Sequence, residues 1–323
     1  MNLENPRIGI LVLNHNGQNW LPTIYQSIRD QSYPRAKMYL VDNASTDSSV
    51  EWTQKEYPEV TILRMPSNLG YCMAYNLAMK QAFVDQCDWA IWANNDVKLE
   101  AACLSSMVAA AQSDARIGVA GPAFLHWEKD EPNYYILGNC PQAIPAIESR
   151  SKDLIDSDWV EGSFLMVRRG CYESVGPLDP FLFLYWEEAD FCRRARFQGW
   201  RVILAPAALA RHYAGGWSKS DRGKKNRANY LRTRNLYIYE LADPSRSFYN
   251  NFIDGFHLFL VNMKEAIQSG PLPMTLYASA YAAVLKDILK IYHKWNRDRK
   301  CGHPPLLNKK FSNVQPQVIP ANP

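Results

Sequence analysis

Short apolar runs alternate with segments of helical periodicity through the first 121 residues. Runs such as RIGILVL at residues 7–13 and WAIWAN at residues 89–94 are rich in β-branched and aromatic side chains and predict strands. Between them, WLPTIYQSIRDQ at residues 20–31 carries apolar side chains at helical spacing and predicts a helix. Further strands are predicted at 38–43, 60–65 and 116–121, and further helices at 44–57, 68–83 and 101–112. Such alternation predicts an α/β fold with a parallel sheet covered on both faces.

The pattern changes after residue 121. Residues 122–158 are rich in Pro, Asn, Asp and Ser and show little periodicity, which indicates a long excursion from the sheet. Strands are predicted again at 159–169 and 201–213, and a helix at 185–200 lies between them. From about residue 221 the pattern is helical, and the proline-containing residues 301–323 are predicted to be a tail. No internal repeat is present.

Polar side chains follow four successive predicted strands. They are Asn14, His15 and Asn16, then Asp42 and Asn43, then Asn68, and finally Asn94, Asn95 and Asp96. A single polar strand end is typical of a turn, and Asp42 before Ser45 fits an Asx turn. Four in succession predict a common rim, because ligands of open α/β sheets bind at the carboxyl ends of the strands.

Composition narrows the class of protein. The chain has 323 residues, 47% hydrophobic and 21% charged, which is ordinary for a globular protein. A net charge of +4 is too small to indicate nucleic acid as the main partner. Its seven cysteines show no CxxC spacing and favour free thiols in a reducing, cytoplasmic compartment. The amino terminus lacks the apolar segment of a signal peptide, and no run approaches the roughly 20 apolar residues of a membrane span.

The phosphate-binding motifs of other α/β enzymes are absent. No GxGxxG follows the first strand, and GxxxxGK[ST] and GxSxG do not occur. A dinucleotide oxidoreductase, a P-loop NTPase and an α/β-hydrolase are therefore disfavoured.

The motifs that are present resemble glycosyltransferase family 2, in particular its bacterial rhamnosyltransferase-like members. The resemblance rests on VLNHNG, VDNASTDSS, NLGYCMAYN, NNDV and the long run from Glu161 to His212, and it covers roughly residues 7–240. It implies a GT-A fold with a mixed, mainly parallel sheet. We expect a catalytic domain at 1–240, with a nucleotide-sugar half at 1–121 and an acceptor half at 122–240. A helical region at 241–300 and the tail complete the chain.

The resemblance implies a donor site for a nucleotide-diphospho-sugar, with UDP- and dTDP-sugars as candidates and L-rhamnose as one candidate sugar. Asp42 would accept the imide N–H of the base, which suits an acceptor-only carboxylate. The implied donor-binding set is Asn14, Asp42, Asn68, Gly70, Asn76, Asn94, Asn95 and Arg234. Met73 fills a position where the family usually has a smaller residue, so the pocket is expected to differ in shape.

The resemblance also implies a metal ion and a catalytic base. Asp96 and His212 would hold Mg²⁺ or Mn²⁺, which neutralises the diphosphate of the leaving nucleotide. Glu188 takes the position of the base that deprotonates the acceptor hydroxyl, although Glu187 and Asp190 stay open as alternatives. All three acids also fit a purely structural role at a helix start. The implied acceptor-binding residues are Gly162, Tyr185 and Trp186.

The role of the last predicted helical segment and the exact reaction are left open by the sequence. Residues 274–300 place apolar side chains on one helix side and six Lys and Arg nearby, which fits either contact with an anionic membrane or packing within the protein. The overall function is predicted to be inverting transfer of a sugar to a glycan or lipid-linked acceptor in surface polysaccharide synthesis. The alternatives are a non-catalytic binding protein of the same fold and a sugar-phosphate nucleotidyltransferase. Acceptor, linkage and oligomeric state stay undetermined.

Overall fold

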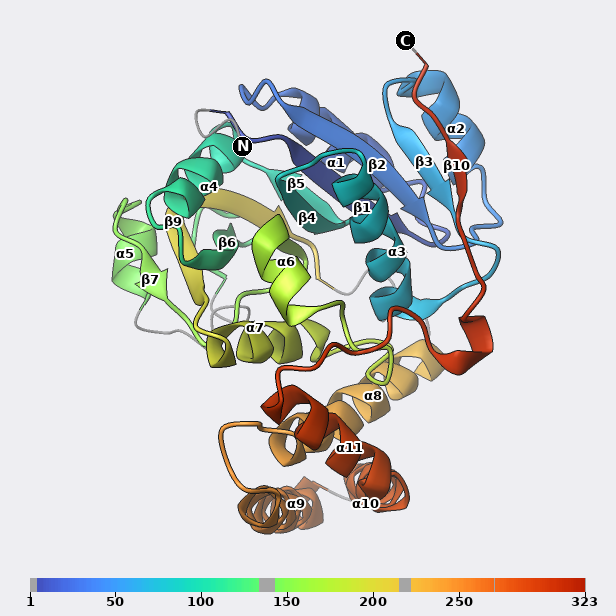
Figure 1. Cartoon of the computed structure of the whole chain (residues 1–323), viewed down its shortest axis with the longest axis vertical. Helices are drawn as coiled ribbons and strands as arrows, with labels where there is room; N and C mark the ends of the chain where they lie inside the picture. The colour runs from blue at the N-terminus through green and yellow to red at the C-terminus, as the bar shows by residue number, and fades with distance from the viewer. Residues whose placement is uncertain (1–4, 134–142, 215–221, 270, 323) are drawn as a thin grey trace.

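The computed structural model describes residues 5–133, 143–214, 222–269 and 271–322, through which one ten-stranded sheet runs above a group of helices (Figure 1). The strand order is β10-β3-β2-β1-β4-β8-β6-β9-β5, with β7 paired to β9. Of the seven cysteines, Cys140 lies outside the described residues. The other six are free thiols, five of them buried.

The first half of the sheet is parallel, as its apolar runs predicted. Its strands and helices are β1 (Ile8–Asn14), α1 (Leu21–Arg29), β2 (Ala36–Asp42), α2 (Ser49–Glu56), β3 (Thr61–Arg64), α3 (Gly70–Val84) and β4 (Trp89–Asn94). The ladder of β1 and β2 ends where Asn14 lies opposite Asp42, and β4 pairs with β1 on the other side. Each strand of this half therefore ends at the same edge.

The second half of the sheet is mixed. Its elements are β5 (Val97–Leu99), α4 (Cys103–Gln112), β6 (Ile117–Leu125), α5 (Ile144–Glu148), β7 (Ile155–Asp156), β8 (Phe164–Arg168), α6 (Arg169–Val175), α7 (Glu187–Phe197) and β9 (Arg201–His212). β8 runs antiparallel between β4 and β6. The three-residue β5, which the sequence pattern did not indicate, runs antiparallel to β9. The expected excursion at 122–158 begins only after β6, which extends to Leu125.

Two hydrophobic clusters cover the two faces of the sheet. Successive residues of β1 alternate between them, as strand geometry requires, so that Leu11 joins one cluster and Ile10 and Val12 the other. One cluster is completed by α1, α2 and α4, and the other by α3, α6, α7 and the C-terminal helices. Both faces of the sheet are thus covered within the described part of the chain, which leaves the ends of the strands as the places where a ligand can approach.

Four helices follow the sheet and lie below α7 in Figure 1: α8 (Arg222–Leu241), α9 (Phe248–Ser269), α10 (Pro271–Lys286) and α11 (Ile288–Arg299). The single helix expected over 276–295 is broken at Asp287, which precedes α11. Ala280 and Val284 on α10 are fully buried in the core, so the packing alternative holds for these two residues. None of the described helices is long and apolar enough to cross a bilayer.

The segment 301–323, for which the sequence indicated only a tail, returns to the sheet. After the 3₁₀ turn η3 (Lys309–Phe311), β10 (Gln317–Ile319) pairs antiparallel with β3. Val318 lies opposite Leu63 of β3. The segment runs along the molecule from α11 to the edge of the sheet at β3 (Figure 1). The C-terminal segment therefore covers the edge strand of the nucleotide half.

Candidate active site

The carboxyl ends of β1 and β2 form one polar edge. The Asn14 amide donates to the hydroxyl of Ser45 at 3.2 Å, and the backbone N–H of Ser45 donates to Oδ1 of Asp42 at 3.2 Å. Asn14 is 1% exposed and Asp42 is fully buried. The two strand ends predicted to converge are thus joined through one turn residue.

Asp42 keeps one carboxylate oxygen without a hydrogen bond. Oδ2 accepts none from the described residues, and Nε of Arg64 lies 3.6 Å from it. Burial raises the pKa of Asp42, although the hydrogen bonds from Ser45 oppose the shift. A buried acceptor without a hydrogen bond destabilises a fold unless a ligand supplies the donor. The imide N–H of uracil or thymine is a donor of the required kind.

Asn95 joins this edge from the end of β4. Its Nδ2 donates to Oδ1 of Asn14 at 2.7 Å. Gly17 packs against the same amide so closely that a β-carbon at residue 17 would overlap it. The backbone N–H of neighbouring Asn94 donates to the carbonyl of Ser163 at 2.8 Å, which ties the edge to the segment before β8. Three of the four predicted strand ends are therefore connected through Asn14.

The fourth strand end forms the start of α3. The Asn43 side chain donates to Oδ1 of Asn68 at 3.1 Å, and the same oxygen accepts the N–H of Gly70 at 3.0 Å. Gly70 has a φ of 78°, and a β-carbon there would overlap the Phe183 ring. Glycine is required here for both reasons. Met73, expected to alter the pocket, is 2% exposed and belongs to the hydrophobic core.

Two residues expected to bind the donor have their side-chain groups engaged elsewhere. Asn76 is fully buried, donates to the carbonyls of Leu178 and Leu306 at 2.9 and 2.8 Å, and accepts the N–H of Leu178. Arg234 donates to Oδ1 of Asn235 at 2.8 Å and pairs with Asp287 at 3.3 Å. Both contacts tie together segments distant in sequence, so the structure gives these two side chains a structural explanation.

Asp96 and His212 are brought together by the pairing of β5 with β9. Val97 lies opposite His212 in this ladder, which places Nε2 of His212 3.2 Å from Oδ1 of Asp96. Both residues are less than a tenth exposed. Nδ1 of His212 lies 3.9 Å from Oε1 of Glu161. Burial raises the pKa of Glu161, whereas the neighbouring His212 lowers it.

Glu161 is not among the site residues that the sequence predicts. The available signal was its place, a carboxylate just before the apolar strand Phe164–Arg168. The same segment carries Gly162, whose carbonyl accepts the Tyr71 hydroxyl at 2.7 Å. A β-carbon on Gly162 would come within 3.2 Å of Cβ of Glu188, so the start of α7 lies directly against this residue.

The first two acids of α7, the buried Glu187 and the half-buried Glu188, each have one buried carboxylate oxygen that accepts no hydrogen bond from the described residues. These are Oε2 of Glu187, which is 4% exposed, and Oε2 of Glu188. Burial and the charge of Glu188 raise the pKa of Glu187 well above its usual value. Burial and the charge of Glu161 raise the pKa of Glu188 to about 8. A carboxylate with such a pKa is a stronger base than an exposed glutamate.

Asp190, the third acid of this helix, differs from the other two. Its carboxylate pairs with Arg194 at 3.0 Å and with Lys294 of α11 at 2.7 Å. Burial raises its pKa, but the two cations outweigh burial and hold the pKa below its usual range. The alternative that Asp190 is the base is therefore disfavoured by its contacts, which describe a structural ion pair.

The turn before α7 has a strained backbone. Phe183, Tyr185 and Trp186 all have φ between 65° and 70°, a region that side-chain-bearing residues rarely adopt. Nδ2 of the fully buried Asn235 lies within 3.0 Å of the carbonyls of Leu182, Leu184 and Tyr185. The Trp186 indole donates to the carbonyl of Arg232 at 3.1 Å. Asn235 thus holds the turn that presents the two predicted acceptor-binding aromatics.

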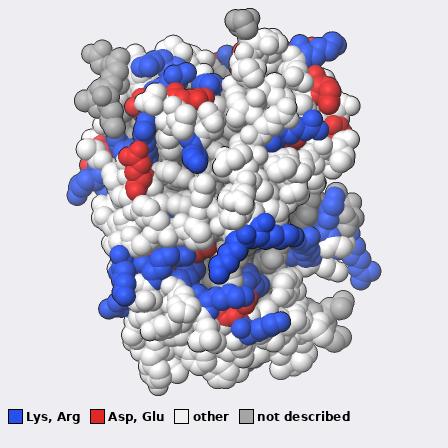
Figure 2. Space-filling view, turned by 45° about the vertical axis from the view of Figure 1, so that its right-hand side comes forward, with Lys and Arg blue, Asp and Glu red and all other residues white. Residues whose placement is uncertain are grey.

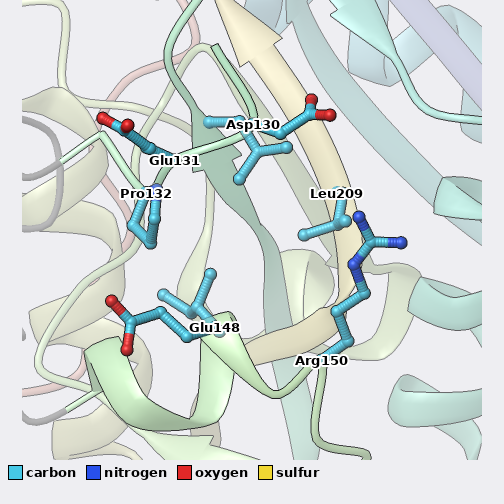
Figure 3. A pocket seen from close by; sticks show the side chains of 8 residues that line it. Asp130, Glu131, Pro132, Glu148, Arg150 and Leu209 are labelled. Carbon is cyan, nitrogen blue, oxygen red and sulfur yellow. The ribbon is translucent and has the colours of Figure 1, made fainter.

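A hollow of about 210 Å³ lies between residues 125–132, residues 147–150 and Leu209 of β9 (Figure 3). Asp130, Glu131, Glu148 and Arg150 line it together with Leu209 and other apolar residues. None of the predicted site residues belongs to this lining. We therefore assign the candidate active site to the strand-end edge and the start of α7.

Comparison with known sequences identifies the family. The model of glycosyl transferase family 2 matches residues 9–174, just over half of the chain, and the chain belongs to this family. It is similar to the N-acetylglucosaminyl-diphospho-decaprenol L-rhamnosyltransferase of Mycobacterium tuberculosis, with 29% identity over 234 residues, 63% of this chain and 74% of the relative. A low-salt glycan biosynthesis hexosyltransferase of Haloferax volcanii is 22% identical over 195 residues, 58% of this chain and 61% of the relative.

Solved structures give the same fold. A mannosyltransferase from Pyrobaculum calidifontis, determined with GDP-mannose and Mn²⁺, matches 92% of this chain and 86% of its own with a TM-score of 0.53 and 15% identity. GalNAc-T7, determined with UDP, GalNAc and Mn²⁺, matches 83% of this chain and 59% of its own with a TM-score of 0.55 and 15% identity. The fold is of the GT-A type, so the predicted fold class and family are confirmed.

Proposed function

We propose that this glycosyltransferase is an inverting, metal-dependent enzyme. It would move a hexose from a nucleotide-diphospho-sugar to a hydroxyl of a glycan or lipid-linked acceptor in surface polysaccharide synthesis. The observation that carries the proposal is the pair of glutamates at the start of α7, each with a buried oxygen that accepts no hydrogen bond from the described residues. Similarity to a rhamnosyltransferase supports L-rhamnose as the first sugar to test.

The strand-end edge would bind the donor. Oδ2 of Asp42 would accept the imide N–H of UDP or dTDP, which satisfies its missing hydrogen bond. Asn14, Asn94 and Asn95 would lie around the ribose and diphosphate. Gly70 would let the backbone at the start of α3 approach the ligand. Asn76 and Arg234 are left out of this set, because their side chains are engaged in structural contacts.

Asp96 and His212 would hold the metal ion. Their ligand atoms are 3.2 Å apart, and bonds of about 2.1 Å to adjacent positions of an octahedral ion separate two ligands by a similar distance. No three His, Cys, Asp or Glu side chains within the described part of the chain gather around one such point. The diphosphate would therefore supply further ligands. Bound Mg²⁺ or Mn²⁺ would neutralise the charge of the leaving diphosphate.

Glu188 would act as the base at its Oε2 atom. As the acceptor oxygen bonds to the anomeric carbon, its proton passes to Glu188. The bond from that carbon to the diphosphate breaks, and the nucleoside diphosphate leaves with the electron pair. Attack on the face opposite the leaving group inverts the configuration. Glu187 is the alternative base, and the aromatic rings of Tyr185 and Trp186, together with Gly162, would contact the acceptor.

The division of the chain follows from these roles. We propose a donor half at 1–121, an acceptor half at 122–240 and a helical region after it. The reducing, cytoplasmic setting is supported by the six free thiols among the described cysteines.

The decisive experiment is calorimetric titration with UDP and dTDP, each with and without Mn²⁺, on the wild-type chain and on Asp96→Ala. Metal-dependent binding that is lost in the variant supports the proposal. Asp158→Ala is a matched control, since the Asp158 side chain is 74% exposed and pairs with the surface residue Arg196. If folded wild-type protein binds neither nucleotide, the alternative of a non-catalytic family member gains the advantage.

A further inference from the structure

One side of α9 carries large apolar side chains that face solvent. Tyr249, Ile253, Phe256, Leu260 and Ile267 are between 44% and 72% exposed. Their spacings of four, three, four and seven residues place them on one line along the helix, because an α-helix has 3.6 residues per turn. We call these five residues the outer stripe.

The outer stripe is additional to the face through which α9 already packs. Asn251 and Ala266 are each 1% exposed, and Phe252 and Phe259 lie against the main core cluster. A helix packed by one face on a protein is normally polar on the other. A line of five large exposed apolar residues therefore marks a contact surface.

The neighbouring helices α10 and α11 also carry exposed apolar side chains. Leu285, Leu289 and Tyr292 are 44%, 72% and 43% exposed. The Tyr292 ring lies 5.1 Å from the ring of Phe248, the first residue of α9. Tyr292 therefore lies beside the first residue of α9, one position before Tyr249 of the outer stripe.

Positive charge is concentrated in the same region. Residues 222–300 contain 14 Lys and Arg against 6 Asp and Glu, whereas the rest of the chain carries more acidic than basic residues. Figure 2 shows a band of Lys and Arg across the molecule above a lower end that is almost free of charge. The exposed basic residues of α8, α10 and α11, with the residue after α11, are Arg222, Lys225, Arg227, Arg232, Lys286, Lys290, Arg299 and Lys300. We call them the basic band.

We propose that the outer stripe and the basic band dock this enzyme on an anionic lipid bilayer. A helix of 22 residues lying along the bilayer surface inserts its apolar side chains below the headgroups, and basic residues beside it contact the lipid phosphates. A second copy of the chain is a poorer occupant, because pairing through this surface brings two strongly positive regions together. The surface centres on α9 and extends onto the 274–300 segment that the sequence suggested.

The inference does not rest on the proposed chemistry, since docking is measured without any sugar transfer. It does place the outer end of the helical region, below α7, towards the membrane (Figure 1). A lipid-linked acceptor would then be presented from that side.

The test is co-sedimentation of the full chain with vesicles of phosphatidylcholine alone or of phosphatidylcholine mixed equally with phosphatidylglycerol. The wild type is expected to sediment with the anionic vesicles and to be released by high salt. Phe256→Asn combined with Leu260→Asn should lower the partition coefficient roughly tenfold or more, because two apolar side chains that would insert into the bilayer are lost. Val84→Asn on α3, where Val84 is 61% exposed, is the matched control and should bind as the wild type.

Each other outcome would overturn the inference. Equal binding to neutral vesicles removes the role of the basic band, and equal binding by the double variant removes the role of the outer stripe. No sedimentation together with a dimer that the double variant abolishes would identify the stripe as a self-association surface. Thermal unfolding and UDP binding of each variant show that the fold and the donor site are intact, so failure of docking is distinguishable from failure of the proposed function.

Discussion

Lys294 of α11 is the centre of a buried ion network that joins the C-terminal helices to the catalytic helix. Its Nζ lies 2.7 Å from Asp190, 2.8 Å from Asp298 and 3.3 Å from Asp179, and none of these side chains is more than 4% exposed. Arg193 and Arg194, which pair with Asp190, and Arg297, which pairs with Asp179 and Asp298, supply further cations. Lys294 is paired with all three carboxylates, so its removal takes away a charge that each of them faces.

Lys294→Met keeps the length of the side chain and removes its charge. Removing one partner of a buried ion pair typically costs about 3–5 kcal/mol, because the remaining charge is buried without compensation. We expect this loss in the free energy of unfolding, measured by denaturant titration at pH 7, with a fall in Tm of roughly 6–20 °C. Lys290→Met is the control. Lys290 is 69% exposed and pairs with Asp287, the residue just before the same helix, so its loss should cost less than about 1 kcal/mol.

The pH dependence gives a second check. In the wild type, burial raises the pKa values of Asp179 and Asp190, but Lys294 and the arginines hold both below the unfolded value. Their stabilisation is therefore present above about pH 4 and lost below it. Without Lys294, burial raises the pKa values of Asp179 and Asp190 with less opposition, so these carboxylates take up protons at higher pH in the variant. The difference in stability between wild type and variant should shrink as pH falls from 7 towards 4. A loss below about 1 kcal/mol, or a difference independent of pH, would refute this reasoning.

Three further predictions concern the site. Glu188→Gln should lower the transfer rate by a factor of roughly 10²–10⁴ and leave nucleotide binding unchanged. The control Glu173→Gln, at an exposed residue, should leave the transfer rate unchanged. A Glu188→Gln variant that transfers sugar as fast as the wild type would exclude Glu188 as the base. The transfer rate should rise with pH as Glu188 ionises. Glu161→Gln should shift this rise to lower pH, because it removes a like charge that raises the pKa of Glu188. A pH profile of kcat/KM that is the same in the variant and the wild type would contradict this effect of Glu161 on Glu188. Asn235→Ala should destabilise the chain by about 1–3 kcal/mol, because three carbonyls near its amide lose their donor, and an unchanged denaturation midpoint would count against this role.

Much of the sheet could be predicted because its strands are marked locally. Apolar runs such as Ile8–Asn14 and Trp89–Asn94 carry their own strand signal, and their parallel order follows from the helices between them. The strands Val97–Leu99 and Gln317–Ile319 carry no such signal. Each has only three residues and exists because a distant strand, β9 or β3, supplies its hydrogen-bond partners. Pairing of this kind is a tertiary effect that local patterns do not record.

The same distinction separates the site residues. The strand-end rim was predictable, because residues at the ends of parallel strands must converge, and Asn14 does contact the ends of two others. The contacts of Asn76 and Arg234 could not be predicted, since their partners lie 230 and 53 residues further along the chain. Glu161 could not be predicted as a site residue, because its part in the site comes from its neighbours His212 and Glu188, which are distant in sequence.

The pairing of β10 with β3 has a consequence for synthesis of the protein. The outer edge of β3 is complete only when residues 317–319 reach it. A ribosome adding about 5–20 residues per second needs roughly 10–50 s to proceed from residue 64 to residue 317. During that interval the nascent sheet presents an open strand edge that can pair with other chains. We therefore expect nascent chains to be exposed to edge-to-edge pairing until late in translation, and chains that end before residue 317 to keep a sheet edge prone to aggregation.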